Sequence, residues 1–251
     1  MIESSHYTRN FYNTQQDGSY ASAQIVLPLV KEAIRPQSVI DVGCGVGYWI
    51  KAWKEEFGID DVMGLEGPYL TVDMLKVSPS SLISFRDLKE PIKMDRKFDL
   101  AMSLEVAEHL PDTRAESFVE DLTKLSDVIL FSAAIVGQEG TYHINEQMPE
   151  YWATLFGRYS YVPVDYIRPK VWANESVEWW YRQNILLYIR KERLADFPLL
   201  TEAYQSTNPA YLLRIHPWLY NYKQAYVTKT RTWKGYAGWR YYLFKKQRRQ
   251  K

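Results

Sequence analysis

The sequence contains one cysteine, no long apolar run, and no acidic residue after Glu202. Because Cys44 stands alone, an intrachain disulfide is excluded, and a reducing compartment is favoured. No apolar stretch approaches the ~18 residues of a membrane-spanning helix, and the first residues lack the basic and apolar segments of a signal peptide. These absences predict a soluble, cytoplasmic protein. With 251 residues, of which 46% are apolar, the chain can bury one full core with additions to it.

Glycine is also scarce, yet three of the 12 glycines lie at alternate positions within one short segment. An apolar stretch, residues 39–42, runs directly into Gly43, Gly45 and Gly47. Residues without Cβ let a chain turn sharply at the end of a strand and lie close to a flat, polar ligand. The third glycine comes one residue earlier than in a dinucleotide fingerprint, and the acidic Asp41 precedes the turn. The segment therefore predicts a nucleotide-type site.

The following sequence repeats a pattern of strands and helices. Glu66 ends the second expected strand, nineteen positions after Gly47, which is about the separation that brings an acid to ribose hydroxyls across a strand–helix–strand unit. The repetition predicts an α/β sheet. The further strands are expected at residues 61–66, 82–88, 97–104, 128–132 and 185–189.

The glycine loop, Glu66 and the pair Asp87-Leu88 together resemble the class I S-adenosylmethionine-dependent methyltransferases over roughly residues 20–191. The resemblance implies an α/β fold: a Rossmann-like, seven-stranded, mostly parallel sheet flanked by helices. It also implies S-adenosyl-L-methionine as cofactor. The residues it implies for cofactor binding are Asp41, Gly43, Gly45, Gly47, Glu66, Asp87, Leu88, Ser103 and Tyr20.

The same resemblance divides the chain into three parts. Residues 1–36 are expected to form an N-terminal lid segment and helix, residues 37–192 the methyltransferase domain, and residues 193–251 a basic, aromatic-rich helical extension. The polar residues 11–20 precede an expected helix at 21–34, which Pro36 ends. In related enzymes such a segment closes over the cofactor, which would make Gln15, Ser19 and Tyr20 lid contacts. A solvated leader is the alternative.

Methyl transfer to an alcohol requires that the hydroxyl lose its proton as it attacks. One solution is a general base, for which His109 and His143 are the candidates, and the other is a divalent metal that lowers the hydroxyl's pKa. Glu105, Glu108 and His109 would lie on one side of a helix. Their Glu-x-x-Glu-His pattern resembles the metal-binding run of ubiquinone-pathway and small-RNA 2′-O-methyltransferases. This resemblance implies an Mg²⁺ or Mn²⁺ site at Glu105, Glu108, His109 and His143, with Glu108 and both histidines as catalytic residues. Purely structural histidines are a third interpretation.

The acceptor is expected to be small and polar. Residues 131–152 are dense in hydrogen-bonding groups, among them Asn145, Glu146 and Gln147, and an aromatic run at residues 179–181 could bind a sugar ring or cover the sheet edge. The predicted function is O-methylation of a saccharide or other small polar metabolite. RNA 2′-O-methylation and N-methylation of a small metabolite are the alternatives.

Charge separates the C-terminal part from the rest of the chain. Residues 203–251 contain eleven Lys and Arg, twelve aromatics and no acid, whereas the preceding residues contain 20 basic and 30 acidic ones, a net charge of −10. This composition suits an anionic membrane surface, such as one that carries lipid-linked sugars. Nucleic acid is less favoured because the acidic body would repel phosphates. A helical hairpin packed on the body is the structural alternative.

Overall fold

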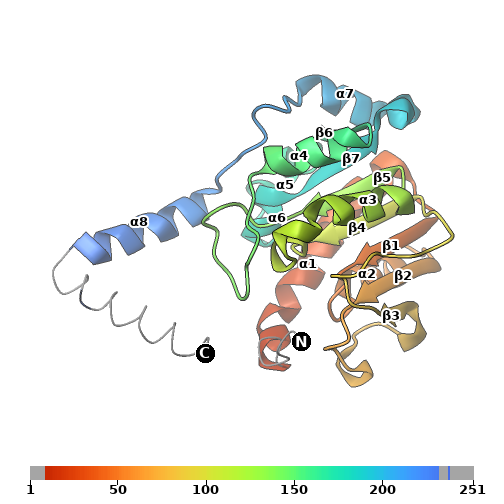
Figure 1. Cartoon of the computed structure of the whole chain (residues 1–251), viewed down its shortest axis with the longest axis horizontal. Coiled ribbons are helices and arrows are strands. Elements are labelled where there is room, and N and C mark those ends of the chain that lie inside the picture. The colour runs from red at the N-terminus through yellow and green to blue at the C-terminus, as the bar shows by residue number, and fades with distance from the viewer. Residues whose placement is uncertain (1–8, 232–236, 238–251) are drawn as a thin grey trace. The chain divides into compact units, whose positions relative to one another are not determined.

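The computed structural model describes residues 9–231 and residue 237, and its centre is one mixed sheet of seven strands (Figure 1). The strand order is β3-β2-β1-β4-β5-β7-β6. The first five strands are parallel, while β7 runs antiparallel to both β5 and β6. The strands are β1 (Ser38–Val42), β2 (Asp61–Glu66), β3 (Ile83–Phe85), β4 (Leu100–Leu104), β5 (Val128–Ser132), β6 (Tyr161–Val164) and β7 (Leu186–Arg190). This sheet confirms the predicted fold class.

Helices cover both faces of the sheet. The α-helices are α1 (Arg9–Ile34), α2 (Tyr48–Glu55), α3 (Ala115–Leu125), α4 (Pro149–Arg158), α5 (Arg168–Val171), α6 (Trp179–Asn184), α7 (Pro198–Ser206) and α8 (Pro217–Arg231). Short 3₁₀ helices are η1 (Val72–Met74), η2 (Ser80–Leu82), η3 (Ala107–His109), η4 (Asp112–Arg114) and η5 (Lys191–Asp196).

Two apolar cores, one on each face, hold the helices to the sheet. Successive strand residues point to opposite faces, so Val39 joins the core formed with α1 and α2, while Ile40 joins the core formed with α3 and α4. The central strands β4 and β5 are buried along their whole length, as parallel strands covered on both faces must be. In α3, Phe118 and Leu122 are one turn apart and fully buried, which fixes the side of the helix that faces the sheet.

The strand order reverses between β1 and β4. From β1 the chain adds β2 and β3 on one side, and from β4 it adds β5 on the other, so the carboxyl ends of β1 and β4 flank a topological switch point. In open α/β sheets, ligands bind in the crevice outside such a point. The glycine loop follows β1 here, and the Glu105–His109 segment follows β4.

Three expected elements differ from those observed. The polar segment at residues 11–20 is part of α1 and does not precede it, so the expected helix start at residue 21 is wrong. Gly18 lets the helix lie close to Glu178, because a Cβ at this position would be 1.9 Å from Oε1 of Glu178. The third strand is shorter than expected and ends at Phe85, before Asp87. The fourth begins at Leu100, later than residue 97.

The chain forms two compact units, one up to Arg214 and one from Ile215. The first unit extends beyond the predicted boundary at residue 192, because Leu200 and Leu212 are buried in its cores. Buried Arg168 also donates from Nη1 to the carbonyl of Leu212 (2.8 Å). Of the second unit, the structure describes residues up to Arg231 and residue 237, so Trp233, Trp239 and the last basic residues lie outside the described part.

Within the described ranges 9–231 and 237, no helix combines the length and the apolar character that crossing a membrane requires.

Candidate methyl-transfer site

The glycine loop turns sharply between β1 and α2. Gly43 and Gly47 adopt left-handed backbone conformations, with φ of +81° and +91°, which glycine tolerates without strain. Their missing side chains also make room for neighbours. A Cβ on Gly43 would lie 2.4 Å from Cγ2 of Val106, and one on Gly47 would lie 2.9 Å from Cγ1 of Val77. Val106 therefore packs the segment after β4 directly against the glycine loop.

Glu66 lies at the end of β2 with its carboxylate buried and hydrogen-bonded. The Gly45 amide donates to Oε2 (2.5 Å), the Gly67 amide donates to Oε1 (2.7 Å), and the Tyr69 hydroxyl also donates to Oε1. Burial raises the pKa of Glu66, and these donors, Tyr69 first, oppose that shift. Buried Asp41 lies close by, and burial together with the charge of Glu66 raises its pKa to about 8. Asp41 is thus largely protonated at neutral pH.

The other residues predicted to bind cofactor lie in different environments. Asp87 is exposed and accepts a hydrogen bond from the Lys89 amide, whereas Leu88 is buried. Ser103 is fully buried in β4, and its Oγ has no hydrogen-bond partner among the described residues. The Tyr20 hydroxyl donates to Glu56, the residue directly after α2 (2.8 Å). Ser19 Oγ lies 3.5 Å from the Tyr181 hydroxyl, and the side chain of Gln15 lies outside the described residues.

Glu105 follows β4 in a left-handed conformation, with φ of +56°, and the 3₁₀ helix η3 begins only at Ala107. The prediction that Glu105, Glu108 and His109 share one helix face is therefore wrong. The carboxylate of Glu105 accepts hydrogen bonds from Asn184 Nδ2 (3.1 and 3.2 Å) and Gln138 Nε2 (3.2 Å). Two neutral amides thus hold this carboxylate.

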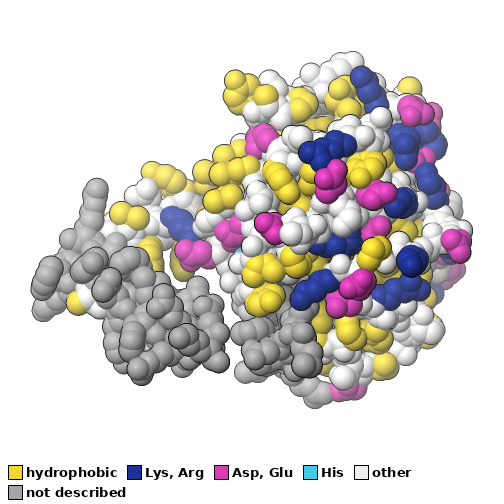
Figure 2. All heavy atoms as spheres, in the orientation of Figure 1, with side chains coloured by type: hydrophobic (Ala, Val, Ile, Leu, Met, Phe, Trp, Pro, Cys, Tyr) yellow, Lys and Arg dark blue, Asp and Glu magenta, His cyan; other side chains and the backbone are white. Residues whose placement is uncertain are grey.

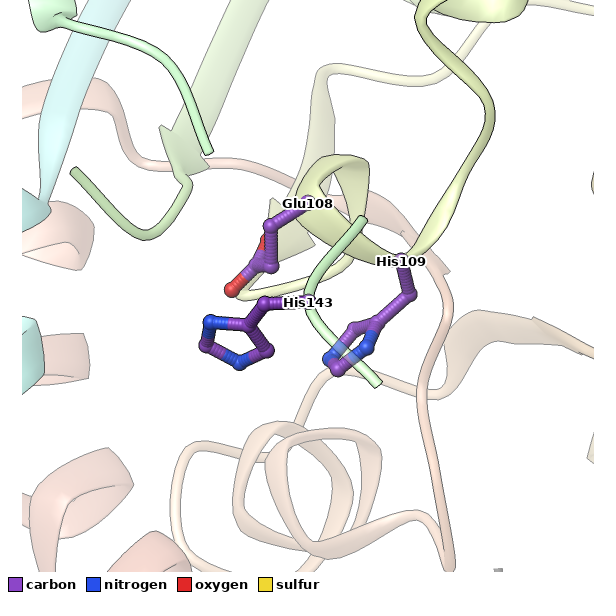
Figure 3. A group of neighbouring side chains, drawn as sticks. All are labelled: Glu108, His109 and His143. Atoms are coloured by element: carbon purple, nitrogen blue, oxygen red, sulfur yellow. The ribbon is translucent and has the colours of Figure 1, made fainter. Parts of the chain in front are cut away.

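Glu108, His109 and His143 form the candidate metal-binding cluster (Figure 3). One potential ligand atom from each residue lies within 4.8 Å of the others. The two imidazole rings meet edge to face, with centroids 4.9 Å apart. Both carboxylate oxygens of Glu108 are buried without a hydrogen-bond partner among the described residues. An unpaired buried carboxylate is costly, and a cation would compensate it.

The protonation states in this cluster follow from burial. Burial, and then the charge of Glu105, raises the pKa of Glu108. The backbone amides of Glu108 and Ala134 lie near the carboxylate without reaching hydrogen-bond geometry, and they offset part of that shift. Burial and the neighbouring His143 lower the pKa of His109 to about 4. His109 is neutral at physiological pH, as a metal ligand must be, but a pKa this low makes it a weak base for an alcohol proton.

The loop between β5 and α4 holds His143 in place. Nδ1 of His143 lies 2.9 Å from Oε1 of Glu146, and the backbone amides of Gly137 and Glu139 donate to the same carboxylate. Asn145 donates to the Ala107 carbonyl (3.4 Å) and accepts from Gln147 (2.9 Å). These three polar side chains, expected to bind the acceptor, thus hydrogen-bond within the protein. The loop also exposes three large apolar side chains, Val136, Ile144 and Met148, and the charged Glu139.

A family profile described as a methyltransferase domain matches residues 12–183, more than half of the chain. The chain belongs to this methyltransferase family. Its glycine loop, switch-point crevice and sheet order are those of a class I S-adenosylmethionine-dependent methyltransferase.

Individual relatives are distant. A probable chloroplastic tocopherol O-methyltransferase from Oryza sativa subsp. japonica is 32% identical over 101 residues, which are 37% of this chain and 26% of that protein, so the match spans about a quarter of the relative. The sugar N-methyltransferase KedS8 from Streptoalloteichus sp ATCC 53650 aligns over 73% of this chain and 93% of its own, with TM-score 0.55 and 14% identity. Magnesium protoporphyrin IX methyltransferase from Synechocystis PCC 6803, solved with bound SAM, aligns over 76% and 98%, with TM-score 0.50 and 16% identity. The structural matches show the shared fold.

Sequence reasoning missed four contacts of this methyltransferase site. Tyr69 on Glu66, Glu146 on His143, and the two amides of Gln138 and Asn184 on Glu105 emerge only from the structure. Asn184 lies 79 residues from Glu105 in the chain, and no local spacing rule relates them. The pairs Glu66–Tyr69 and His143–Glu146 are each three residues apart, so only these two contacts are local in the sequence.

Proposed function

We propose that the enzyme transfers the methyl group of S-adenosylmethionine to a hydroxyl of a saccharide or another small polar metabolite, with a divalent cation bound by Glu108, His109 and His143. The observation that carries this proposal is the buried Glu108 carboxylate without a hydrogen-bond partner among the described residues, beside two imidazoles. Glu105, the fourth predicted ligand, is held by amides outside this group.

The donor set supports a transition metal more than magnesium. Two imidazoles and one carboxylate suit Mn²⁺, whereas Mg²⁺ prefers oxygen ligands and retains several waters. When bound, such a cation lowers the pKa of a coordinated hydroxyl. The protein's own residues prepare the site: Glu146 orients the His143 ring, and the Tyr142 carbonyl lies 3.3 Å from Nδ1 of His109. A cation bound by this cluster would coordinate one nitrogen of each ring.

The surroundings of the cluster support an acceptor with both polar and apolar surface. Asn145, Glu146 and Gln147 hydrogen-bond internally, and the exposed Ile144 directly follows His143. A pyranose ring combines hydroxyls at its edge with an apolar C–H face, which fits this combination. RNA 2′-O-methylation and N-methylation remain the alternative reactions.

The test is incubation with methyl-labelled S-adenosylmethionine and Mn²⁺, offering in separate reactions a nucleotide-sugar and monosaccharide panel, total small RNA, and primary amines. We expect label in an O-methyl ether of a sugar, loss of label with a chelator, and recovery on adding Mn²⁺. Label in RNA or in an N-methyl product would replace the proposed acceptor. Turnover that is indifferent to chelators but falls with acid would replace the cation with a histidine base.

We also propose that the C-terminal extension docks on an anionic lipid surface. Helix α8 has no acidic residue and exposes Trp218, Tyr220, Tyr222 and Tyr226, and Figure 2 shows apolar side chains along it. Trp and Tyr settle at the headgroup level, and each nearby Lys or Arg contributes about 1 kcal/mol at most. Full-length protein should therefore sediment with phosphatidylserine vesicles at low salt and be released at high salt. Trp218→Ala with Tyr222→Ala should weaken this binding, and no sedimentation at low salt would refute it.

A further inference from the structure

Glu66 carries more internal hydrogen bonds than cofactor binding allows. A carboxylate has about four positions at which it accepts hydrogen bonds. In Glu66 three of them are filled: Oε1 accepts from the Gly67 amide and the Tyr69 hydroxyl, and Oε2 accepts from the Gly45 amide. If Glu66 binds both hydroxyls of the cofactor ribose, two positions are needed. One internal donor must therefore leave.

Two of the three donors are fixed by the backbone. Gly67 directly follows β2, which pairs with both β1 and β3. Gly45 lies in the loop whose preceding amides, those of Gly43 and Cys44, both donate to the Leu65 carbonyl (2.8 and 3.1 Å). Neither amide can withdraw without opening the sheet edge. Tyr69 is the donor that a side-chain rotation removes.

The Tyr69 ring is positioned for this role. It lies on Gly67, where a Cβ would be 2.1 Å from its Cε1, and it packs with Val46 and Leu70 beside the glycine loop. The ring is only partly buried, so it can turn toward solvent. Since Gly67 has no left-handed φ, the glycine serves here to admit the ring.

We propose that Tyr69 is an internal competitor of the cofactor: its hydroxyl occupies the position on Glu66 that a ribose hydroxyl takes, and binding requires the ring to swing away. This inference rests on the proposed cofactor role of Glu66. The measured affinity for cofactor is then the intrinsic affinity multiplied by the fraction of molecules in which Tyr69 has released Glu66. Tyr69 thereby sets the cofactor concentration at which the enzyme becomes loaded.

The test is calorimetric titration of S-adenosylhomocysteine into the wild type, Tyr69→Phe and Tyr159→Phe. Phenylalanine keeps the ring and removes the competing hydroxyl, and a hydrogen bond to a charged group is strong enough that its loss should tighten binding roughly tenfold. Tyr159 lies at the end of α4 and controls for loss of a tyrosine hydroxyl as such. Its variant should bind like the wild type. Unchanged or weaker binding by Tyr69→Phe overturns the proposal.

A second ligand separates competition at the ribose from a general effect. The 2′,3′-dideoxy analogue of S-adenosylhomocysteine has no hydroxyl for Glu66 and leaves Tyr69 in place, so Tyr69→Phe should bind it no more tightly than the wild type does. An equal gain for both ligands overturns the proposal. If the wild type binds neither ligand, the proposed cofactor role has failed, a result distinct from failure of the competition.

Discussion

Two buried glutamates, Glu66 at the end of β2 and Glu108 after β4, differ in their hydrogen bonding. Glu66 accepts three hydrogen bonds, whereas Glu108 has none from the described residues. Burial raises the pKa of both carboxyls, and it raises that of Glu108 well above the ordinary value. A carboxylate that already accepts hydrogen bonds from neutral donors can exchange one of them for a ribose hydroxyl. An unsatisfied one is stable as an anion only beside a cation, so the contrast separates ribose recognition from metal binding.

The strongest way to break this contrast is Glu108→Gln. We expect it to lower Mn²⁺ affinity by at least about a hundredfold, because it removes the one anionic ligand of the cluster. Because burial favours the neutral form of Glu108 when no metal is bound, and glutamine is also neutral, the same change should alter the stability of the metal-free protein by less than about 1 kcal/mol. Mn²⁺ electron paramagnetic resonance and thermal unfolding measure the two effects. Unaltered Mn²⁺ binding would exclude Glu108 as a ligand.

Glu66→Ala should weaken S-adenosylhomocysteine binding by about 1.5–3 kcal/mol, the worth of hydrogen bonds to a charged group. Calorimetry measures the change. Asp87→Asn provides the comparison, because Asp87 is exposed and is the less central of the two acids. If Glu66→Ala keeps its affinity while folded, the ribose is held elsewhere.

Glu146→Gln tests the support of His143. Loss of the carboxylate partner at 2.9 Å should reduce Mn²⁺ affinity roughly 10- to 100-fold, as removal of outer-shell partners does. The Gly137 and Glu139 amides donate to different oxygens of Glu146, so the single glutamine oxygen keeps one of these hydrogen bonds and the other is lost. Thermal unfolding of the metal-free variant checks that the loop stays folded. Equal Mn²⁺ affinity in this variant and the wild type would show that His143 needs no carboxylate.

The two ends of the site should also respond to pH in opposite directions. Because the pKa of His109 is lowered from 6.5 to about 4, the unfolded state binds the extra proton in this window, and stability rises with pH. Because the pKa of Asp41 is raised from 3.8 to about 8, the folded state binds the extra proton, and stability falls with pH. Each slope is at most about 1.4 kcal/mol per pH unit, so the two nearly cancel between pH 4 and 6.5 in the cofactor-free protein.

Single variants should uncover each slope. His109→Gln removes the rising contribution, so its unfolding free energy relative to the wild type should fall from pH 4 to 6.5, whereas that of Asp41→Asn relative to the wild type should rise. Urea titrations at several pH values provide these free energies. Parallel profiles for both variants would contradict the opposed shifts.

Sequence predicted the frame of the molecule better than its contacts. The segments 61–66 and 128–132 match β2 and β5 to the residue, because polar or turn-forming residues bound the apolar residues of each strand. β6 was not located, since its four residues include Pro163 at the sheet edge. The continuous helix expected from Glu105 failed because nothing local signals a left-handed residue held by distant amides.

The polar loop shows a second limit of sequence reasoning. Composition identified Asn145, Glu146 and Gln147 as hydrogen-bonding groups, but not whether their partners are ligand or protein. The residue type determines which hydrogen bonds a side chain can make, and only the tertiary structure shows which partners it has. The same applies to Glu66. Its sequence position predicted a contact with the cofactor, but it did not predict the hydrogen bond from Tyr69, three residues further along the chain.

The antiparallel β7 has a consequence for the order in which the site is made. Because this strand enters the sheet from the edge where the parallel strands end, it delivers Asn184 to Glu105 from 79 residues further along the chain. During synthesis the ribosome completes the glycine loop, Glu66, Glu108 and both histidines before this amide exists. A nascent or truncated chain that stops short of Asn184 has every predicted ligand and cofactor residue, yet it lacks an amide that holds Glu105. The site is therefore complete only after the segment that leads into β7 has been synthesised, and the earlier motifs alone do not complete it.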